Sequence, residues 1–125
     1  MARILIIDDT PVAITVKQAL VAAGYEVHTS TPPKRGARLA EPGPISLAII
    51  PVLLPGNDRL DSLRQLRRHF PSIPILTIPG RSPSDQDAKL LAQLGSTRLM
   101  DYSFTPTTLL GAVAAVMGHR FDEQK

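Results

Sequence analysis

The sequence predicts a single α/β domain with a doubly wound, parallel sheet of five strands in the order 2-1-3-4-5. Apolar runs of strand length alternate with helical patterns five times along the chain. Such alternation is typical of right-handed crossovers that place helices on both faces of a parallel sheet. The chain has 125 residues, 43% of them hydrophobic, which suits one compact core. Without an internal repeat or linker, we expect one domain over residues 1–118 and a polar tail, or the beginning of a linker, over 119–125.

The first two strands and the helix between them are each predicted by a pattern in the local sequence. Residues 3–7 form an apolar, β-branched run. Pro11 then favours the first turn of a helix, where an N–H is not needed, and Gly24 ends that helix. Residues 25–30 alternate as a second strand. Residues 31–38 predict only a weak second helix, because they contain a glycine.

The third strand ends in an unexpected residue. Residues 46–50 form a short run rich in Leu and Ile, and we expect this strand to stop near Pro51. In an open parallel sheet the reactive groups lie just beyond the carboxyl ends of the strands, so Pro51 occupies a position where a functional side chain is expected. Asp58 is placed to cap the next helix, which Pro71 ends.

That helix has one apolar and one polar face. The apolar stripe, expected to be buried, consists of Leu60, Leu63, Leu66 and Phe70. The polar residues, expected to face water, are Asp61, Arg64, Gln65, Arg67 and Arg68. The remaining elements are a strand over 73–78, a helix from Ser82 or Ser84 to Leu94, a strand over 97–101, and a helix that begins at Thr105 and Pro106 and ends near Met117 or Gly118.

Composition excludes several classes of protein. The chain has no cysteine, which excludes disulfides, thiolate zinc sites and thiol catalysis and fits a reducing cytosol. We find neither a signal peptide nor an apolar run of membrane-spanning length, so we expect a soluble, cytoplasmic protein without membrane contact. A formal charge of +3 allows weak attraction to acidic partners but falls short of a nucleic-acid signature.

Nearly the whole chain resembles the receiver domain of two-component response regulators, the CheY-like family with a flavodoxin-like fold. The resemblance rests on ILIIDD, IIPVLLPGND, IPILTIPG and the last helix. In that family an acidic pair after the first strand and an aspartate ending the third strand hold magnesium, and that aspartate accepts a phosphoryl group from a histidine kinase. A hydroxyl residue ending the fourth strand and a lysine ending the fifth contact the phosphoryl group, and an aromatic residue on the fifth strand follows the change.

Carried over position by position, the resemblance implies a degenerate phosphorylation site. The matching positions are Asp8 and Asp9 for the acidic pair, Pro51 for the phosphoacceptor aspartate, Pro79 for the hydroxyl residue, Tyr102 for the lysine and Leu99 for the aromatic switch. Proline has no nucleophilic oxygen, so acyl-phosphate chemistry is lost at position 51. Tyr102 offers no positive charge at neutral pH to offset a phosphate.

The acidic pair is the remainder of the metal site. Magnesium favours carboxylate oxygens, but without a third carboxylate we expect Asp8 and Asp9 to bind it weakly at most. The alternative is that Asp9 and Thr10 only begin the first helix, where negative charge is favourable. We therefore expect no resident metal, no cofactor and no catalytic residue.

The last helix predicts an interaction surface. No charged residue occurs from Tyr102 to Gly118, although a surface helix usually carries charge on its outer side. Its small residues form one face, consisting of Thr107, Gly111, Ala114, Ala115 and Gly118. This face predicts a protein partner, or a homodimer through the fourth helix, fifth strand and fifth helix. An Ala-rich exposed helix that needs no partner is an equal alternative.

A basic ridge is a second candidate surface. The fold would bring together two groups of cationic residues, Lys34, Arg35 and Arg38 from the second helix with Arg64, Arg67 and Arg68 from the third. Such a ridge can meet an acidic protein or a nucleic-acid backbone. No aromatic residues are interleaved with it, so we favour a solvated face and do not expect this domain to bind nucleic acid.

The sequence thus favours a phosphorylation-independent pseudo-receiver that signals through protein–protein interaction and is not an enzyme. One alternative is a receiver-like switch that responds to a small ligand or ion near Asp8, Pro51 and Tyr102. Another is the N-terminal regulatory domain of a larger DNA-binding regulator. A flavodoxin-like enzyme is disfavoured, because the histidines have no nucleophile–base spacing and no Gly-rich phosphate loop is present. The partner, the oligomeric state, the input signal and any following output domain stay open.

Overall fold

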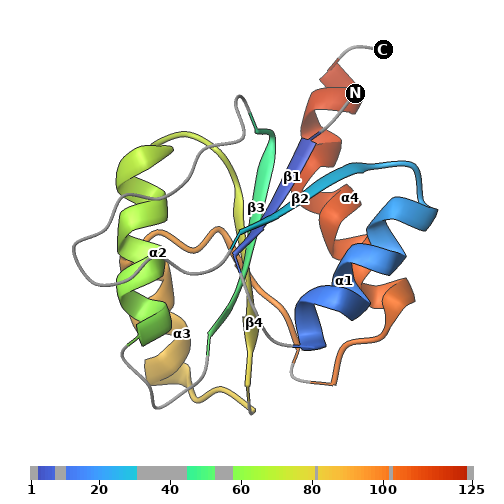
Figure 1. Cartoon of the computed structure of the whole chain (residues 1–125). Helices are drawn as coiled ribbons and strands as arrows, with labels where there is room; N and C mark the ends of the chain where they lie inside the picture. The colour runs from blue at the N-terminus through green and yellow to red at the C-terminus, as the bar shows by residue number, and fades with distance from the viewer. Residues whose placement is uncertain are drawn as a thin grey trace.

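The computed structural model describes residues 3–7, 11–30, 45–52, 58–80, 82–101 and 103–123, without the side chains at 58–59 and 118–123. Strands and helices alternate through this part of the chain (Figure 1). The strands are β1 (Arg3–Ile7), β2 (Glu26–Ser30), β3 (Leu47–Val52), β4 (Ile75–Pro79) and β5 (Arg98–Leu99). The helices are α1 (Pro11–Ala22), α2 (Asp58–His69), α3 (Asp85–Gln93) and α4 (Pro106–Glu123). The weak helix expected over 31–38 lies outside the described residues.

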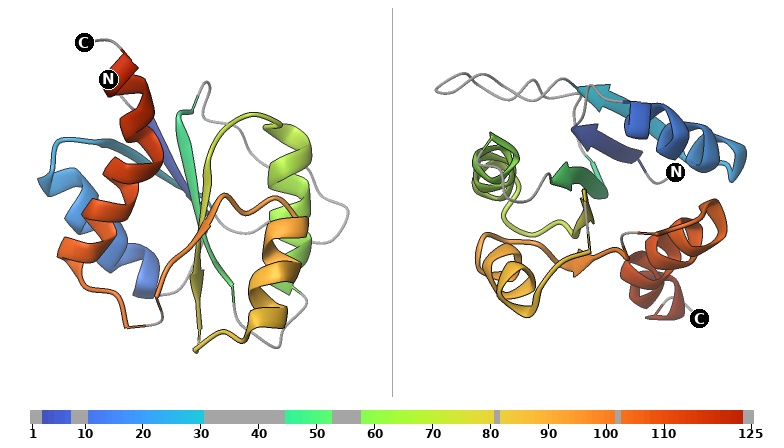
Figure 2. Two further views of the ribbon diagram at one scale, coloured as in Figure 1. Left: turned by 180° about the vertical axis from the view of Figure 1, so that it is seen from behind. Right: turned by 90° about the horizontal axis from the view of Figure 1, so that it is seen from below.

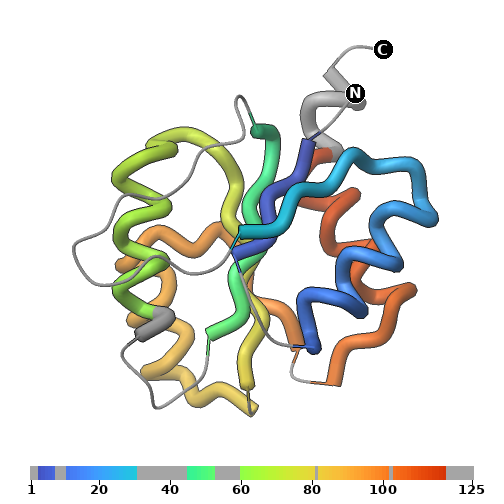
Figure 3. Tube along the Cα trace, in the orientation of Figure 1, coloured from blue at the N-terminus to red at the C-terminus, as the bar shows by residue number. Residues whose placement is uncertain are grey.

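The strands form one sheet in the order β2-β1-β3-β4-β5, and every neighbouring pair is parallel. Helices α1 and α4 cover one face of this sheet, and α2 and α3 cover the other (Figure 2). The Cα trace shows α2 and α3 side by side on their flank (Figure 3). The predicted doubly wound α/β fold is therefore confirmed, including the strand order.

Two hydrophobic clusters fill the space between the sheet and its helices. On the α1 and α4 side the cluster includes Ile4, Ile6, Val16, Leu20, Leu47, Ile49, Leu76, Ile78, Leu109, Val113 and Met117. On the α2 and α3 side it includes Leu5, Ile7, Ala48, Ile50, Val52, Leu60, Leu63, Leu66, Ile75 and Leu91. All six positions of β3 are buried because both faces of this central strand are covered, which explains its continuous apolar sequence.

Two helices begin with reciprocal side-chain caps. At α3 the Ser84 hydroxyl accepts from the Asp87 N–H at 3.1 Å, and the Asp87 carboxylate accepts from the Ser84 N–H at 3.0 Å. The structure therefore selects Ser84 over Ser82 as the cap. At α4 the Thr105 hydroxyl accepts from the Thr108 N–H at 3.2 Å, and the Thr108 hydroxyl accepts from the Thr105 N–H at 2.7 Å. This confirms the predicted helix start at Thr105 and Pro106.

The ends of some elements differ from the predictions. α4 runs to Glu123 rather than ending near Gly118. One glycine inside a helix costs only about 1 kcal/mol, and no proline follows it to stop the helix. β5 is reduced to Arg98–Leu99, and β4 begins at Ile75 rather than at residue 73. None of the helices in the described part of the chain has the length and apolarity needed to cross a membrane.

Candidate functional site at the strand ends

β3 runs through Pro51 and ends at Val52, so the expected end of this strand near Pro51 is confirmed. The Gly80 N–H donates to the Val52 carbonyl oxygen at 2.9 Å, so Val52 bonds to β4. Backbone groups alternate in direction along a strand, and the missing N–H of Pro51 therefore points toward β1. The register between β1 and β3 ends at Ile49, so Pro51 removes no hydrogen bond from the paired part of either ladder.

Pro79 is accommodated in the same way at the end of β4. The Met100 N–H donates to the Thr77 carbonyl oxygen at 2.8 Å, so Thr77, and by alternation Pro79, points its backbone groups toward β5. The register between β4 and β5 ends at Thr77 and Leu99, before it reaches Pro79. The two prolines thus occupy the ends of neighbouring strands without disrupting the β3–β4 ladder.

The prolines lie close in the sheet but on opposite faces. Pro51 is paired with Ile78, and Val52 with Pro79. Side chains alternate along a strand, so Pro51 falls on the α1 and α4 side with Ile78, whereas Pro79 falls on the α2 and α3 side with Val52. Both prolines are buried. At both positions the side chain is a hydrocarbon ring that neither donates nor accepts a hydrogen bond.

Leu99, the expected switch position, lies on β5 opposite Thr77. It is half-buried and packs against the apolar cluster beneath α2 and α3. The other residues expected near the strand ends, Asp8, Asp9 and Tyr102, lie outside the described residues, so their roles stay predictions. Within the described ranges, no three His, Cys, Asp or Glu side chains are grouped so that they could hold a metal ion.

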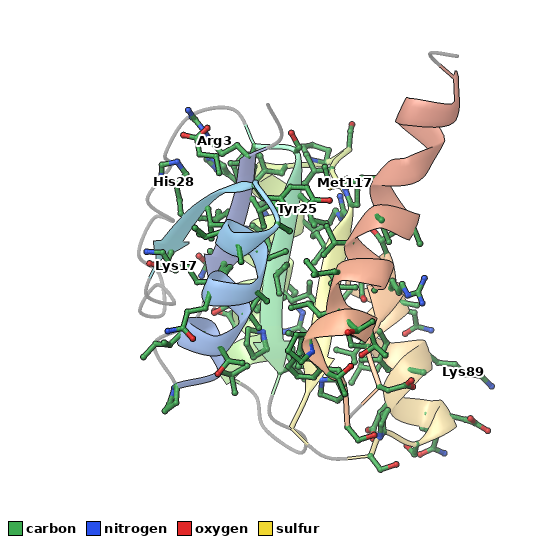
Figure 4. The ribbon with its side chains drawn as sticks, turned by 90° about the vertical axis from the view of Figure 1, so that its right-hand side faces the viewer. Arg3, Lys17, Tyr25, His28, Lys89 and Met117 are labelled. Carbon is green, nitrogen blue, oxygen red and sulfur yellow. The ribbon has the colours of Figure 1, made fainter. Side chains whose placement is uncertain are left out.

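The titratable cluster that the structure does show lies at the opposite, amino-terminal end of the sheet. Glu26 Oε1 is 3.2 Å from Arg3 Nη2 and 3.2 Å from His28 Nε2. Arg3 and His28 lie near each other at the β2 edge (Figure 4). Hydrogen bonding to Arg3, and secondarily to His28, lowers the pKa of the Glu26 carboxyl below its usual value. Because this cluster ties β1 to β2 at their first residues, it is distant from the strand ends that hold the prolines.

The described members of the small-residue face of α4 are exposed. The large residues Leu109, Val113 and Met117 are buried against the sheet. The residues on the other side, Thr107, Gly111, Ala114 and Ala115, are exposed, while the predicted member Gly118 lies beyond the described side chains. A Cβ atom added at Gly111 would meet nothing within 4 Å. α4 lies on the face of the sheet opposite to α3, whose Lys89 is exposed (Figure 4).

The basic ridge is only partly present. Arg64 and Arg68 on α2 are exposed. Arg67 was predicted to face water, but its guanidinium is turned onto backbone carbonyl groups, including Gly95 O at 2.7 Å from Nη2. This part of the prediction was wrong because helical periodicity specifies only the direction of the Cβ atom, whereas a long arginine side chain reaches laterally to acceptors at the helix end. The proposed partners Lys34, Arg35 and Arg38 lie outside the described residues.

The fold and the position of the candidate site are those of a CheY-like signalling domain. The profile of the family described as response regulator receiver domain matches residues 4–114, most of the chain. The protein therefore belongs to the response regulator receiver domain family of two-component systems. Receiver domains are signalling modules that act on other proteins or on effector domains.

Solved structures and characterised relatives agree with this assignment. A CheY-like receiver domain protein from Methanospirillum hungatei JF-1 superposes with a TM-score of 0.79 at 25% identity over 98% of each chain. The chemotaxis protein CheY4 of Vibrio cholerae gives a TM-score of 0.75 at 25% identity, over 93% of this chain and 98% of CheY4.

Two full-length regulators are similar in sequence. The alkaline phosphatase synthesis transcriptional regulatory protein PhoP of Bacillus subtilis is 28% identical over 116 residues, which are 92% of this chain and 48% of PhoP. The cell cycle transcriptional regulator CtrA of Caulobacter vibrioides is 28% identical over 117 residues, 94% of this chain and 50% of CtrA. The chain thus spans about half the length of these curated relatives.

Proposed function

We propose that the protein is a pseudo-receiver, a signalling domain that does not accept a phosphoryl group and has no enzymatic activity. The observation that carries the proposal is the buried proline at position 51, near the carboxyl end of β3, where a receiver carries its phosphoacceptor aspartate. Phosphoryl transfer to a protein needs a nucleophilic oxygen. The proline ring has none, and it is packed among apolar residues of the sheet.

The neighbouring positions support the same proposal. Pro79 replaces the hydroxyl residue that would contact a phosphoryl group, and its buried ring supplies no donor. Tyr102 replaces the lysine and carries no charge at neutral pH. Leu99 replaces the aromatic switch and is packed as an ordinary apolar residue. With the acceptor, hydroxyl and lysine positions all replaced, the site lacks the nucleophile, a hydrogen-bond donor and the positive charge that would stabilise a phosphoryl group.

The experiment that tests this proposal is intact-mass spectrometry after incubation with magnesium and acetyl phosphate, a small-molecule phosphodonor. We expect an unchanged mass, with a typical receiver as a positive control that gains one phosphoryl group under the same conditions. An acid-stable or acid-labile phosphoryl adduct on this chain would refute the proposal. We also expect no resident cofactor, and at most weak magnesium binding at Asp8 and Asp9.

We further propose that the signal passes through the face formed by α3, β5 and α4, either to a protein partner or to a second copy of the chain. From Pro106 to Met117, the part of α4 whose side chains are described, the exposed residues are small and uncharged, so another helix can approach the backbone closely there. The matched variants are Ala115→Arg, which places a long cation on this face, and Lys17→Arg, which keeps the charge of exposed α1. Light scattering should show dissociation of a native dimer in the first variant only. An unchanged mass in Ala115→Arg would refute the dimer.

A second candidate function is the regulatory domain of a longer DNA-binding regulator in the cytosol. The observation that favours it is the similarity to PhoP and CtrA, two transcriptional regulators of about twice the matched length. In that case α3, β5 and α4 would contact an effector domain, and the domain itself would not bind DNA. An electrophoretic mobility assay with this chain alone should show no shift at low salt.

A further inference from the structure

The most extensive polar network in the described structure is centred on Arg67 near the end of α2. Its Nη1 donates to the carbonyl oxygens of Phe70 at 3.0 Å, Pro71 at 3.0 Å and Ile73 at 2.8 Å. Its Nε and Nη2 donate to the Gly95 carbonyl oxygen at 3.2 and 2.7 Å. One guanidinium therefore connects the loop between α2 and β4 with the turn between α3 and β5.

The acceptors around Arg67 are all neutral. Four are backbone carbonyls and the fifth, at 3.5 Å, is the Thr97 hydroxyl. Burial lowers the pKa of the Arg67 guanidinium, which is half-buried rather than free in water. A planar guanidinium has five N–H donors in a fixed fork, and the contacts around Arg67 use all of them, with the two N–H groups of Nη1 shared among three carbonyl oxygens. The arrangement resembles a structural clamp rather than an anion site, because the acceptors already occupy its donors.

The turn at Gly95 lies in close contact with the Arg67 side chain. Gly95 has a φ of +114°, which favours glycine. A Cβ atom built there would lie 2.7 Å from Arg67 Cγ, 2.8 Å from Nε and 2.9 Å from Cβ. The backbone at Gly95 thus approaches the arginine stem as closely as a glycine permits, so the two residues fix each other's position.

The network continues from the clamp into β4 and β5. Thr97 accepts from the Ile75 N–H with its hydroxyl at 2.9 Å and donates its own N–H to the Ile75 carbonyl oxygen at 2.8 Å. The buried Thr77 hydroxyl lies 2.9 Å from the Ser96 hydroxyl. Both hydroxyl groups also contact the Arg98 carbonyl oxygen, at 3.3 and 3.2 Å. Every residue from 95 to 98 is therefore held by a polar contact to a neighbouring element.

We propose that Arg67 is a conformational lock that holds residues 95–99 in one position against α2, so that α3 and β5 present a fixed surface without a phosphorylation signal. This inference rests on the proposed function, since it assigns the lock to the face that would meet the partner. Arg67 is a positioning residue here, because it acts through the turn at Gly95 and does not itself lie on the surface of β5.

Amide hydrogen exchange of the full chain, followed by NMR under native conditions, tests the lock. The test variant is Arg67→Met, which keeps a long aliphatic stem but has no donor. The control is Arg68→Met, which removes one exposed charge from the same last turn of α2. We expect the amides of Ser96 and Thr97 to exchange at least about tenfold faster in the test variant, the factor that corresponds to losing one or two hydrogen bonds. The amides of β1 should change much less, and the control should match the unmodified chain.

Two results would overturn the lock. One is an equal acceleration in β1 and β5, which would mean that Arg67 contributes only to global stability. The other is an unchanged exchange rate at Ser96 and Thr97. If Arg67→Met does not fold, Arg67→Lys takes its place, because one ammonium has three donors on a single nitrogen where the guanidinium has five on three nitrogens, and it should give the same local pattern. A phosphoryl adduct in the mass experiment would refute the proposed function while leaving these exchange rates, and hence the lock, unaffected.

Discussion

Replacing Gly95 by alanine should destabilise the protein in two ways, through backbone strain and through a clash with the Arg67 side chain. The φ of +114° is unfavourable for alanine by about 1 to 2 kcal/mol. The new Cβ atom would also lie 2.7 Å from Arg67 Cγ, so the arginine must move and lose its bonds to the Gly95 carbonyl oxygen. A hydrogen bond from a charged donor contributes about 1.5 to 3 kcal/mol. We therefore expect Gly95→Ala to lower the free energy of unfolding by about 2.5 to 5 kcal/mol.

Two other substitutions provide matched controls. Gly24 has a φ of +96° but open space around its Cβ position, so Gly24→Ala should show the backbone strain alone, about 1 to 2 kcal/mol. Gly111 lies within α4 with nothing within 4 Å, so Gly111→Ala should stabilise the protein by about 1 kcal/mol through helix propensity.

Urea unfolding followed by far-ultraviolet circular dichroism is a suitable assay, since the chain contains no tryptophan for fluorescence. The three variants should rank with Gly95→Ala least stable, then Gly24→Ala, then Gly111→Ala. Equal losses at Gly95 and Gly24 would show that Arg67 does not pack against the turn as described, and would refute the reasoning.

Three further predictions concern caps, core and charge. Thr105→Ala removes the reciprocal cap of α4 and should lower the free energy of unfolding by about 1 kcal/mol in urea titrations, while Thr105→Ser should retain most of it. Leu63→Ala leaves a cavity at a fully buried position between α2 and the sheet and should lower the free energy of unfolding by about 2 to 5 kcal/mol in the same assay. Because Arg3 lowers the pKa of Glu26 in the folded state, the stability it contributes is present above the ordinary carboxyl pKa and is lost as the pH falls through the lowered value. Thermal melts between pH 7 and 3 should therefore show a smaller loss in Glu26→Gln, and an identical loss would contradict this.

Local sequence signals were enough to predict most of the fold. The capping pair before α4 and the helix-ending glycines Gly24 and Gly95 act within a few residues, so they can be identified without tertiary structure. The strand order followed from the alternation of elements, because crossover handedness restricts the arrangements available to a parallel sheet.

The features that sequence reasoning missed depend on direction in space. Pro51 correctly indicated where β3 ends, but not that the proline itself lies within the strand, with its missing N–H facing β1 beyond the paired register. Arg67 lies at a polar position of the helical pattern, but its acceptors come from residues 70–73 and from Gly95, 28 residues along the chain. The spacing of residues within α2 cannot predict these distant acceptors. Gly95, followed closely by Thr97 and a short strand, could have indicated a turn at this point of the chain.

The most direct test of the pseudo-receiver proposal is an amide NMR titration of the chain with magnesium and then with magnesium and beryllofluoride, which mimics the phosphoryl group on an aspartate. We predict that adding beryllofluoride causes no further saturable shift of the amides near Pro51, Pro79 and Leu99, because position 51 has no carboxylate to coordinate beryllium. Saturable shifts at the ends of β3 and β4 in the beryllofluoride step would contradict the proposal, because they would show that the strand ends still bind a phosphoryl mimic.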